Sequence, residues 1–180
     1  MTESPPPTDQ APEHPEAVPA TGAALRAALR HVPSPVAVVT VRTAGGVRGA
    51  TIGSFASVSL DPPLVSFNVT HGTRLHAALA EADRWAVHLL AAEQAALAER
   101  FALPDLDGTD QLAPFPHVAP PDGPPMLRGA LGILVCTPHA RVEAGDHTVW
   151  IGAVEEIVDG AGRAPLLYYH QSYRAVGDEV

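Results

Sequence analysis

A stretch of small hydroxyl residues between positions 49 and 73 carries the clearest chemistry in the sequence. Its hydroxyls include those of Thr51, Ser54, Ser57 and Ser59. The stretch ends at Thr73-Arg74, where a helical pattern begins, so hydroxyls, backbone N–H groups, a guanidinium and a helix N-terminus lie close together in sequence. A helix N-terminus and an arginine side chain both favour an anion. The stretch therefore suits a ligand with a flat polar edge and a phosphate tail.

The residue composition argues against several other kinds of chemistry. All 11 basic residues are arginine, which excludes a Schiff-base lysine and the lysine of a P-loop. The net charge of −9 argues against nucleic acid, whose binding needs a basic surface. No apolar run approaches the ~20 residues that cross a bilayer, and the first residues lack the basic-then-apolar pattern of an export signal. We therefore expect a cytoplasmic protein that binds neither nucleic acid nor a membrane.

The histidines and the cysteine do not predict a metal centre. The 9 histidines show neither H-x-x-x-H nor H-E-x-x-H spacing, so we expect no catalytic metal. Cys136 is the only cysteine and lies in an apolar run, which predicts a packed, unreactive thiol.

The elements that must position the hydroxyl stretch follow from composition and periodicity. Residues 1–20 are rich in proline and acid and contain no basic residue, which is typical of a disordered tail; residues 21–176 form one domain, with Thr21 as the N-cap of a first helix. Apolar runs predict strands over residues 36–42, 47–52, 64–69, 85–90, 131–142, 147–158 and 166–169. Helices are predicted over residues 74–83 and 92–103, and a proline-rich loop over 104–125.

The predicted elements suggest an architecture and a set of core positions. Many strands and few helices favour an antiparallel barrel with peripheral helices. The residues expected to face a core are Ile52, Phe55, Val58 and Leu60 in the hydroxyl stretch, Leu75, Ala78, Leu79 and Ala82 in the first of these helices, and Ala96, Leu97, Ala98 and Phe101 in the second.

Four motifs, in this order along the chain, resemble the flavin reductase-like family. They span residues 36–40, 51–65, 145–154 and 165–169. The resemblance implies a mainly β fold, an antiparallel split β-barrel that binds FMN, and a homodimer. It also implies transfer of hydride from NADH or NADPH to FMN or FAD, with the reduced flavin supplied to a partner monooxygenase. No G-x-G-x-x-G opens a helix after a strand, so the nicotinamide dinucleotide must bind in another way. The resemblance implies that it folds over the flavin in an open cleft.

The same resemblance assigns site residues. The flavin would be bound by Arg48, Gly49, Ala50, Thr51, Gly53, Ser54, Ser57, Ser59, Asn68, Val69, Thr70, Thr73, Arg74, Arg100 and Phe101, with its phosphate at Arg74. The nicotinamide would be bound by His147, Tyr168, Tyr169 and His170. His147 would orient the hydride donor and lie away from the flavin phosphate. Many relatives carry an amide side chain where this chain has Gly53, so one flavin contact is missing or replaced by water.

Several assignments have a structural alternative. Ser57 and Ser59 also fit local backbone hydrogen bonds, Phe101 fits a core position, and His147 fits a histidine bonded to a carbonyl at a strand start. Tyr168 and Tyr169 also fit aromatic packing. At the level of function, the alternatives are a non-catalytic flavin-binding protein and an oxidase that retains its flavin on the same fold.

Overall fold

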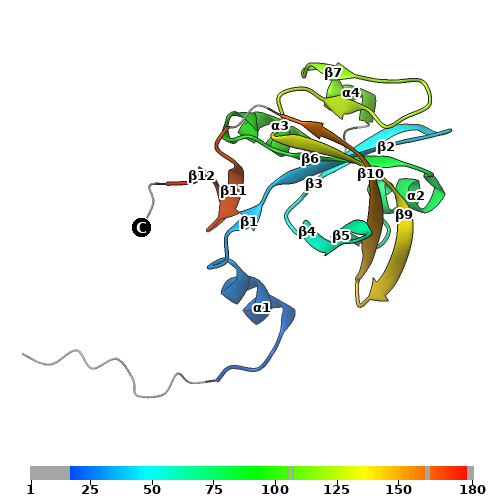
Figure 1. The fold of residues 1–180 in the computed structure, drawn as a ribbon. Coiled ribbons are helices and arrows are strands. Elements are labelled where there is room, and N and C mark those ends of the chain that lie inside the picture. Colours follow the sequence, from blue (N-terminus) through cyan, green and yellow to red (C-terminus); the bar gives the residue numbers. More distant parts are fainter. Residues whose placement is uncertain (1–16, 105, 107, 161–162, 178–180) are drawn as a thin grey trace, which may run out of the picture. The chain divides into compact units, whose positions relative to one another are not determined.

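The computed structural model describes residues 17–104, 106, 108–160 and 163–177, and it divides into two compact units, Met1–Val32 and Pro33–Val180 (Figure 1). In the first unit, helix α1 (Gly22–Leu29) begins after Thr21, whose hydroxyl accepts a hydrogen bond from the Ala24 N–H at 3.1 Å. The predicted N-cap is therefore confirmed. Most of the predicted tail, residues 1–16, lies outside the described residues.

Strands dominate the second unit. Its largest sheet is antiparallel throughout and has the spatial order β3 (Gly46–Ile52), β2 (Ala37–Thr43), β6 (Trp85–Leu89), β9 (Gly132–Ala144), β10 (His147–Asp159), β5 (Pro63–Thr70) and β4 (Ala56–Leu60). Smaller sheets join β1 (Ser34–Pro35), β11 (Leu166–Tyr169) and β12 (Ser172–Ala175), and β7 (His117–Val118) with β8 (Met126–Leu127). The helical segments are α2 (Arg74–Glu81), the 3₁₀ turn η1 (Ala92–Gln94), α3 (Ala95–Phe101) and α4 (Gly108–Leu112). The predicted mainly β fold with peripheral helices is confirmed.

The large sheet is buried on both faces in its centre. One face packs around Trp85, whose ring meets Phe67 and Trp150 edge-on at centroid distances of 6.1 and 6.4 Å. Helix α2 covers this face with Leu75, Ala78, Leu79 and Ala82, as its periodicity predicted. The other face, which carries Val38, packs against α3 and α4. Because successive strand residues point to opposite faces, a continuous apolar run such as that of β2 fits burial on both sides.

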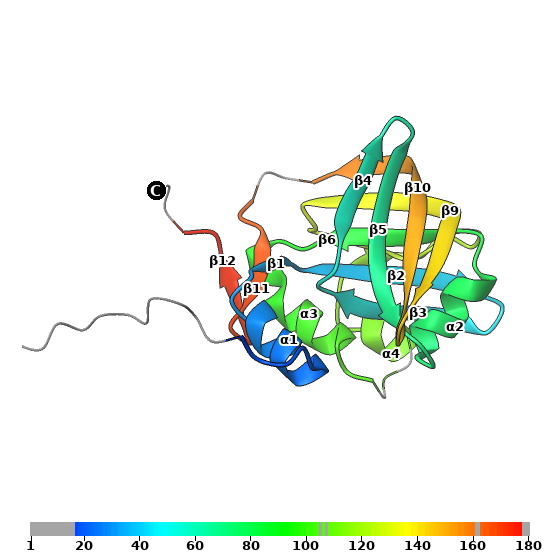
Figure 2. The ribbon, with the colours of Figure 1, turned by 90° about the horizontal axis from the view of Figure 1, so that it is seen from below.

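The strands curl so that β3 and the end of β5, which are far apart in the order of the sheet, approach each other. Figure 2 shows the end of β5 beside β3 and α2. The β9–β10 hairpin turns at Gly145, whose φ of +65° favours glycine, and its ladder shifts register at Ile151–Gly152. A Cβ on Gly152 would lie 2.9 Å from both Trp85 and Cys136, so glycine is needed there for packing.

Four expectations about the elements were wrong. Residues 104–125 are not all loop, because they contain α4 and β7, and β12 follows the strand that was expected to be the last. Ala96 is exposed. Val58 and Leu60 are 49% and 91% exposed, since β4 is an edge strand with an irregular register and only Phe55 and Ile52 reach the core.

None of the helices in the described part of the chain is long and apolar enough to cross a bilayer.

Candidate functional site

A cleft of about 770 Å³ opens where β3, the β5–α2 turn and the α3–α4 segment meet. Most of the residues predicted to bind flavin line it: Arg48, Gly49, Ala50, Thr51, Gly53, Ser54, Asn68, Val69, Thr70, Thr73, Arg74 and Phe101. His147 lines the same cleft. The structure therefore brings residues from four separate segments to one site.

Strand β3 forms the floor of the cleft and supports α3. The Thr51 hydroxyl donates a hydrogen bond to the Ala98 carbonyl of α3 at 2.6 Å. At Gly49, a Cβ would lie 2.6 Å from the Phe101 ring and 3.1 Å from the Val39 carbonyl oxygen. Gly49 thus admits the Phe101 ring, and it also lines the cleft. Gly53 differs, since the nearest atom to an added Cβ is 3.8 Å away.

One wall of the cleft, which we call the polar wall, comprises the β5–α2 turn and the start of β10. Thr73 caps α2: its hydroxyl accepts a hydrogen bond from the His76 N–H at 3.2 Å and donates one to the Thr70 carbonyl at 3.0 Å. Arg74 follows as the first helical residue, on the exposed side of α2, and the first turn holds no acidic residue. This end of the cleft therefore combines a guanidinium with the positive end of a helix, which together suit a phosphate.

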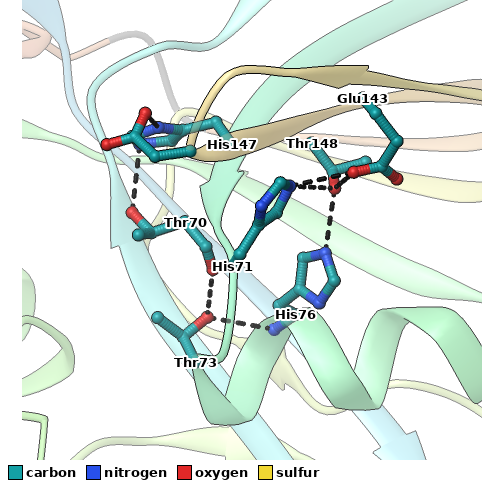
Figure 3. A network of polar contacts seen from close by, with 8 residues as sticks. Thr70, His71, Thr73, His76, Glu143, His147 and Thr148 are labelled. Atoms are coloured by element: carbon teal, nitrogen blue, oxygen red, sulfur yellow. Dashed lines mark hydrogen bonds and ion pairs between the residues drawn. The ribbon is translucent and has the colours of Figure 1, made fainter.

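His147 belongs to the polar wall, directly opposite Thr70 in the β5–β10 ladder (Figure 3). Its Nδ1 lies 2.7 Å from Asp146 Oδ1 and its Nε2 lies 3.0 Å from Thr70 Oγ1. These contacts fit a ring that donates from Nδ1 and accepts the Thr70 hydroxyl proton at Nε2. The hydrogen bond from His147 lowers the pKa of Asp146. The Thr70 carbonyl accepts the hydrogen bond from the Thr73 hydroxyl, so His147 is linked to the N-cap of α2 only through Thr70. The expectation that His147 lies away from the flavin phosphate stays a prediction.

The opposite wall, which we call the apolar wall, comprises the end of α3 and the segment leading to α4. Phe101 is 2% exposed and packs with Leu97, so the core interpretation holds. Phe101 also lines the cleft, and its contact with the flavin stays a prediction. In this wall the sequence analysis missed Ala102, Leu103, Pro104, Leu106 and Gln111, and elsewhere in the cleft it missed Ile52, Gly72 and Leu75 as lining residues. Gln111 is a polar side chain only 3% exposed. No local pattern indicated it, because α4 is too short to show a helical period.

The other predicted site residues lie outside this cleft. Ser57 and Ser59 are on the edge strand β4, and Arg100 donates from Nη2 to the Asp110 carbonyl at 3.1 Å, which links α3 to α4. Tyr168, Tyr169 and His170 belong to the β11–β12 hairpin, in the separate small sheet. Within this hairpin the ring of Tyr168 contacts that of Tyr173, and the ring of Tyr169 contacts that of His170, at centroid distances of 5.4 and 4.5 Å. Their proposed roles in binding stay predictions.

The remaining reactive groups do not add chemistry to the cleft. Burial raises the pKa of the Cys136 thiol to about 12, so the expected packed, unreactive thiol is confirmed. Within the part of the chain that the structure describes, no group of three His, Cys, Asp or Glu side chains is placed to hold a metal ion.

Comparison with known proteins gives one consistent result. The model of the flavin reductase like domain matches residues 29–177. An NADH:FMN oxidoreductase of Rhodococcus qingshengii is 39% identical over 153 residues, which cover 82% of this chain and 78% of that protein. The reductase component of 4-hydroxyphenylacetate 3-monooxygenase of Thermus thermophilus is 36% identical over 151 residues, 84% and 94% of the two chains. A solved NADH:FAD oxidoreductase of Streptomyces globisporus, in complex with NAD and FAD fragments, superposes with a TM-score of 0.79 at 34% identity. The superposition covers 85% of this chain and 91% of that chain.

Proposed function

Because the chain belongs to the flavin reductase-like family, we propose that it is an NADH-dependent flavin reductase that transfers hydride from the nicotinamide to FMN or FAD. The observation that carries this proposal is the cleft itself, which joins a floor of small residues to an anion-binding end at Thr73 and Arg74. The names of the three similar proteins given above, two NADH:flavin oxidoreductases and one reductase component, support the same reaction, and two of them name NADH.

Different residues of the cleft would bind the flavin phosphate, the flavin ring and the nicotinamide. Arg74 and the N-terminus of α2 would hold the flavin phosphate, and the hydroxyls and backbone groups of residues 51–54 would meet the polar edge of the ring. When bound, the flavin and the nicotinamide supply the hydride chemistry themselves. His147 would orient the nicotinamide from the polar wall, and the hydride step requires no proton from it. Phe101 and Leu106 would exclude water from the apolar side.

The finer parts of the proposal concern architecture and partners. We assign the curled sheet to the split β-barrel class, since β3 approaches β5 without sharing a ladder with it among the described residues. A homodimer would cover exposed apolar side chains such as Leu60 and Ile157, which sedimentation velocity can test. The reduced flavin would be used by a partner monooxygenase, as the name of the Thermus thermophilus relative suggests.

The decisive experiment is an NADH oxidation assay at varied flavin, combined with flavin titration of Arg74→Ala. We expect FMN-dependent NADH oxidation by the wild-type chain. Arg74→Ala should weaken FMN binding by about 1.5–3 kcal/mol, the range for a hydrogen bond to a charged group, and should change riboflavin binding far less. Arg84→Ala is a matched control, because Arg84 pairs with Glu156 outside the cleft.

Two outcomes would contradict the proposal. Equal losses of FMN and riboflavin affinity in Arg74→Ala would remove the phosphate from this end of the cleft. Tight flavin binding without NADH oxidation would favour the alternative, a non-catalytic flavin-binding protein.

A further inference from the structure

A second layer of polar side chains lies behind the polar wall and does not line the cleft (Figure 3). It consists of His71 in the β5–α2 turn, His76 in α2, Glu143 in β9 and Thr148 in β10. The Nε2 atoms of His71 and His76 lie 3.1 and 2.9 Å from Thr148 Oγ1. Thr148 Oγ1 lies 3.1 Å from Glu143 Oε2, and His71 Nε2 lies 2.9 Å from the same carboxylate oxygen.

Thr148 is the centre of this layer and is fully satisfied. It is 0% exposed, and its hydroxyl has one proton to donate and two lone pairs to accept hydrogen bonds. With the proton donated to Glu143, both lone pairs are left for the two imidazoles. His71 and His76 must then each carry a proton on Nε2. The four side chains therefore form one hydrogen-bonded network, in which the other three contact Thr148 and His71 also contacts Glu143.

The layer joins the segments that carry the residues of the polar wall. His71 lies between Thr70 and Thr73 in sequence, and its N–H also donates to the Asp146 carbonyl at 3.0 Å. Thr148 follows His147, and because side chains alternate along a strand, one faces the cleft and the other faces the layer behind it. The rear layer and the residues Thr70, Thr73 and His147 therefore share the same two segments of the chain.

We propose that His71, His76, Glu143 and Thr148 form a positioning cluster, which holds the β5–α2 turn against the β9–β10 hairpin and so sets how tightly the cleft binds the phosphate of its flavin. The inference rests on the proposed function, since it assumes that a flavin phosphate binds at Thr73 and Arg74. The four residues act through the polar wall, because none of them lines the cleft.

The test uses Thr148→Val and Thr148→Ser in the full chain. Valine keeps the buried, branched shape and removes only the hydroxyl, whereas serine keeps the hydroxyl. We expect Thr148→Val to weaken FMN binding about fivefold in a fluorescence titration, with riboflavin within about twofold of wild type, as for one lost hydrogen bond that acts on the phosphate end. Thr148→Ser should bind FMN with an affinity within about twofold of the wild type.

A second pair of variants covers the case in which Thr148→Val fails to fold. Glu143 and Glu156 are similarly exposed carboxylates on neighbouring strands, and each contacts a basic side chain, His71 and Arg84 respectively. Removal of a negative charge near the phosphate relieves Coulomb repulsion, and this effect alone would tighten FMN binding. A positioning role predicts the opposite sign for Glu143→Ala, about threefold weaker binding, with Glu156→Ala unchanged.

The possible results separate the two proposals. A wild-type chain that does not bind FMN would overturn the proposed function and the positioning role together. If the wild type binds FMN, then equal FMN affinity in Thr148→Val, or an equal loss for FMN and riboflavin, would overturn the positioning role alone. Tighter FMN binding in Glu143→Ala would also overturn it, because charge rather than position would then be the cause.

Discussion

The two walls of the cleft are built by different means. The polar wall is held by hydrogen bonds between side chains of the β5–α2 turn and the β9–β10 hairpin, such as that from Thr70 to His147. The apolar wall is held by burial: Phe101 fills the space above Gly49, and Leu112 of α4 packs in the same core. Polar contacts are directional, so the first wall suits the recognition of a phosphate, while the second suits the exclusion of water.

The histidines differ in the same way. The polar wall and its rear layer use His71, His76 and His147, whose rings bond to hydroxyls and carboxylates near the surface. The face of the sheet behind the apolar wall contains His88, opposite Val38 in the β2–β6 ladder. His88 is fully buried, its Nδ1 lies 2.8 Å from the Val38 carbonyl oxygen, and its Nε2 has no hydrogen-bond partner among the described residues.

Acid should lower the stability of the folded protein through His88, which lies on the face of the sheet behind the apolar wall. Burial lowers the pKa of His88 from 6.5 to about 4, against the raising effect of nearby carbonyls. The folded state thus holds His88 neutral while the unfolded chain takes up a proton below pH 6.5, so stability is lost as the pH falls from 6.5 to 4. The expected loss at pH 4, relative to pH 7.5, is about 3 kcal/mol from this group.

Urea unfolding across this pH range measures that loss. His88→Gln, which cannot take up a proton, provides the control and should show a flatter dependence on pH. A dependence that is the same in the wild type and in His88→Gln would assign the acid sensitivity to other groups.

The addition of one methyl group to the apolar wall should also lower the free energy of unfolding. Gly49→Ala would place a Cβ 2.6 Å from the buried Phe101 ring, which cannot move freely because Leu97 packs against it. Overpacking of this kind costs about 2 kcal/mol of unfolding free energy. Gly53→Ala, with open space at the same strand, should change stability by less than about 0.5 kcal/mol in the same urea titration. Equal stability of the two variants would show that Phe101 yields easily.

The sequence predicted the polar wall better than the apolar wall, for physical reasons. An N-cap is a local feature, so Thr73 and the start of α2 at Arg74 could be read from a few consecutive residues, and the structure confirms them. The family could also be predicted, because its motifs are continuous segments, and the match over residues 29–177 confirms it. The position of His147 depends on strand register, which pairs it with Thr70 and which no local pattern specifies.

The apolar wall depends on contacts between distant segments. Gln111 reaches the cleft on a five-residue helix inside a proline-rich stretch, where periodicity cannot be detected. The exposure of Val58 and Leu60 had a related cause: alternation shows that a strand has two unlike faces, but not whether that strand lies at the edge of a sheet. Such features follow from tertiary packing alone.

The smallest expected effect concerns the floor between the two walls, at Gly53. The family resemblance led us to expect an amide at this position, and the structure has room for one, since an added Cβ would lie 3.8 Å from Ser34 Cβ and the backbone of Gly53 is outside the left-handed region. Gly53→Asn should add one hydrogen bond to the flavin ring or ribityl chain and tighten binding by about 1 kcal/mol. FMN and riboflavin should gain equally, in contrast to Arg74→Ala, which should affect FMN alone. Gly53→Ala is the control for the backbone change and should leave both affinities unaltered. If Gly53→Asn instead strengthens FMN and not riboflavin, the floor near Gly53 contacts the phosphate, and the division of the cleft into a phosphate end and a ring floor is wrong.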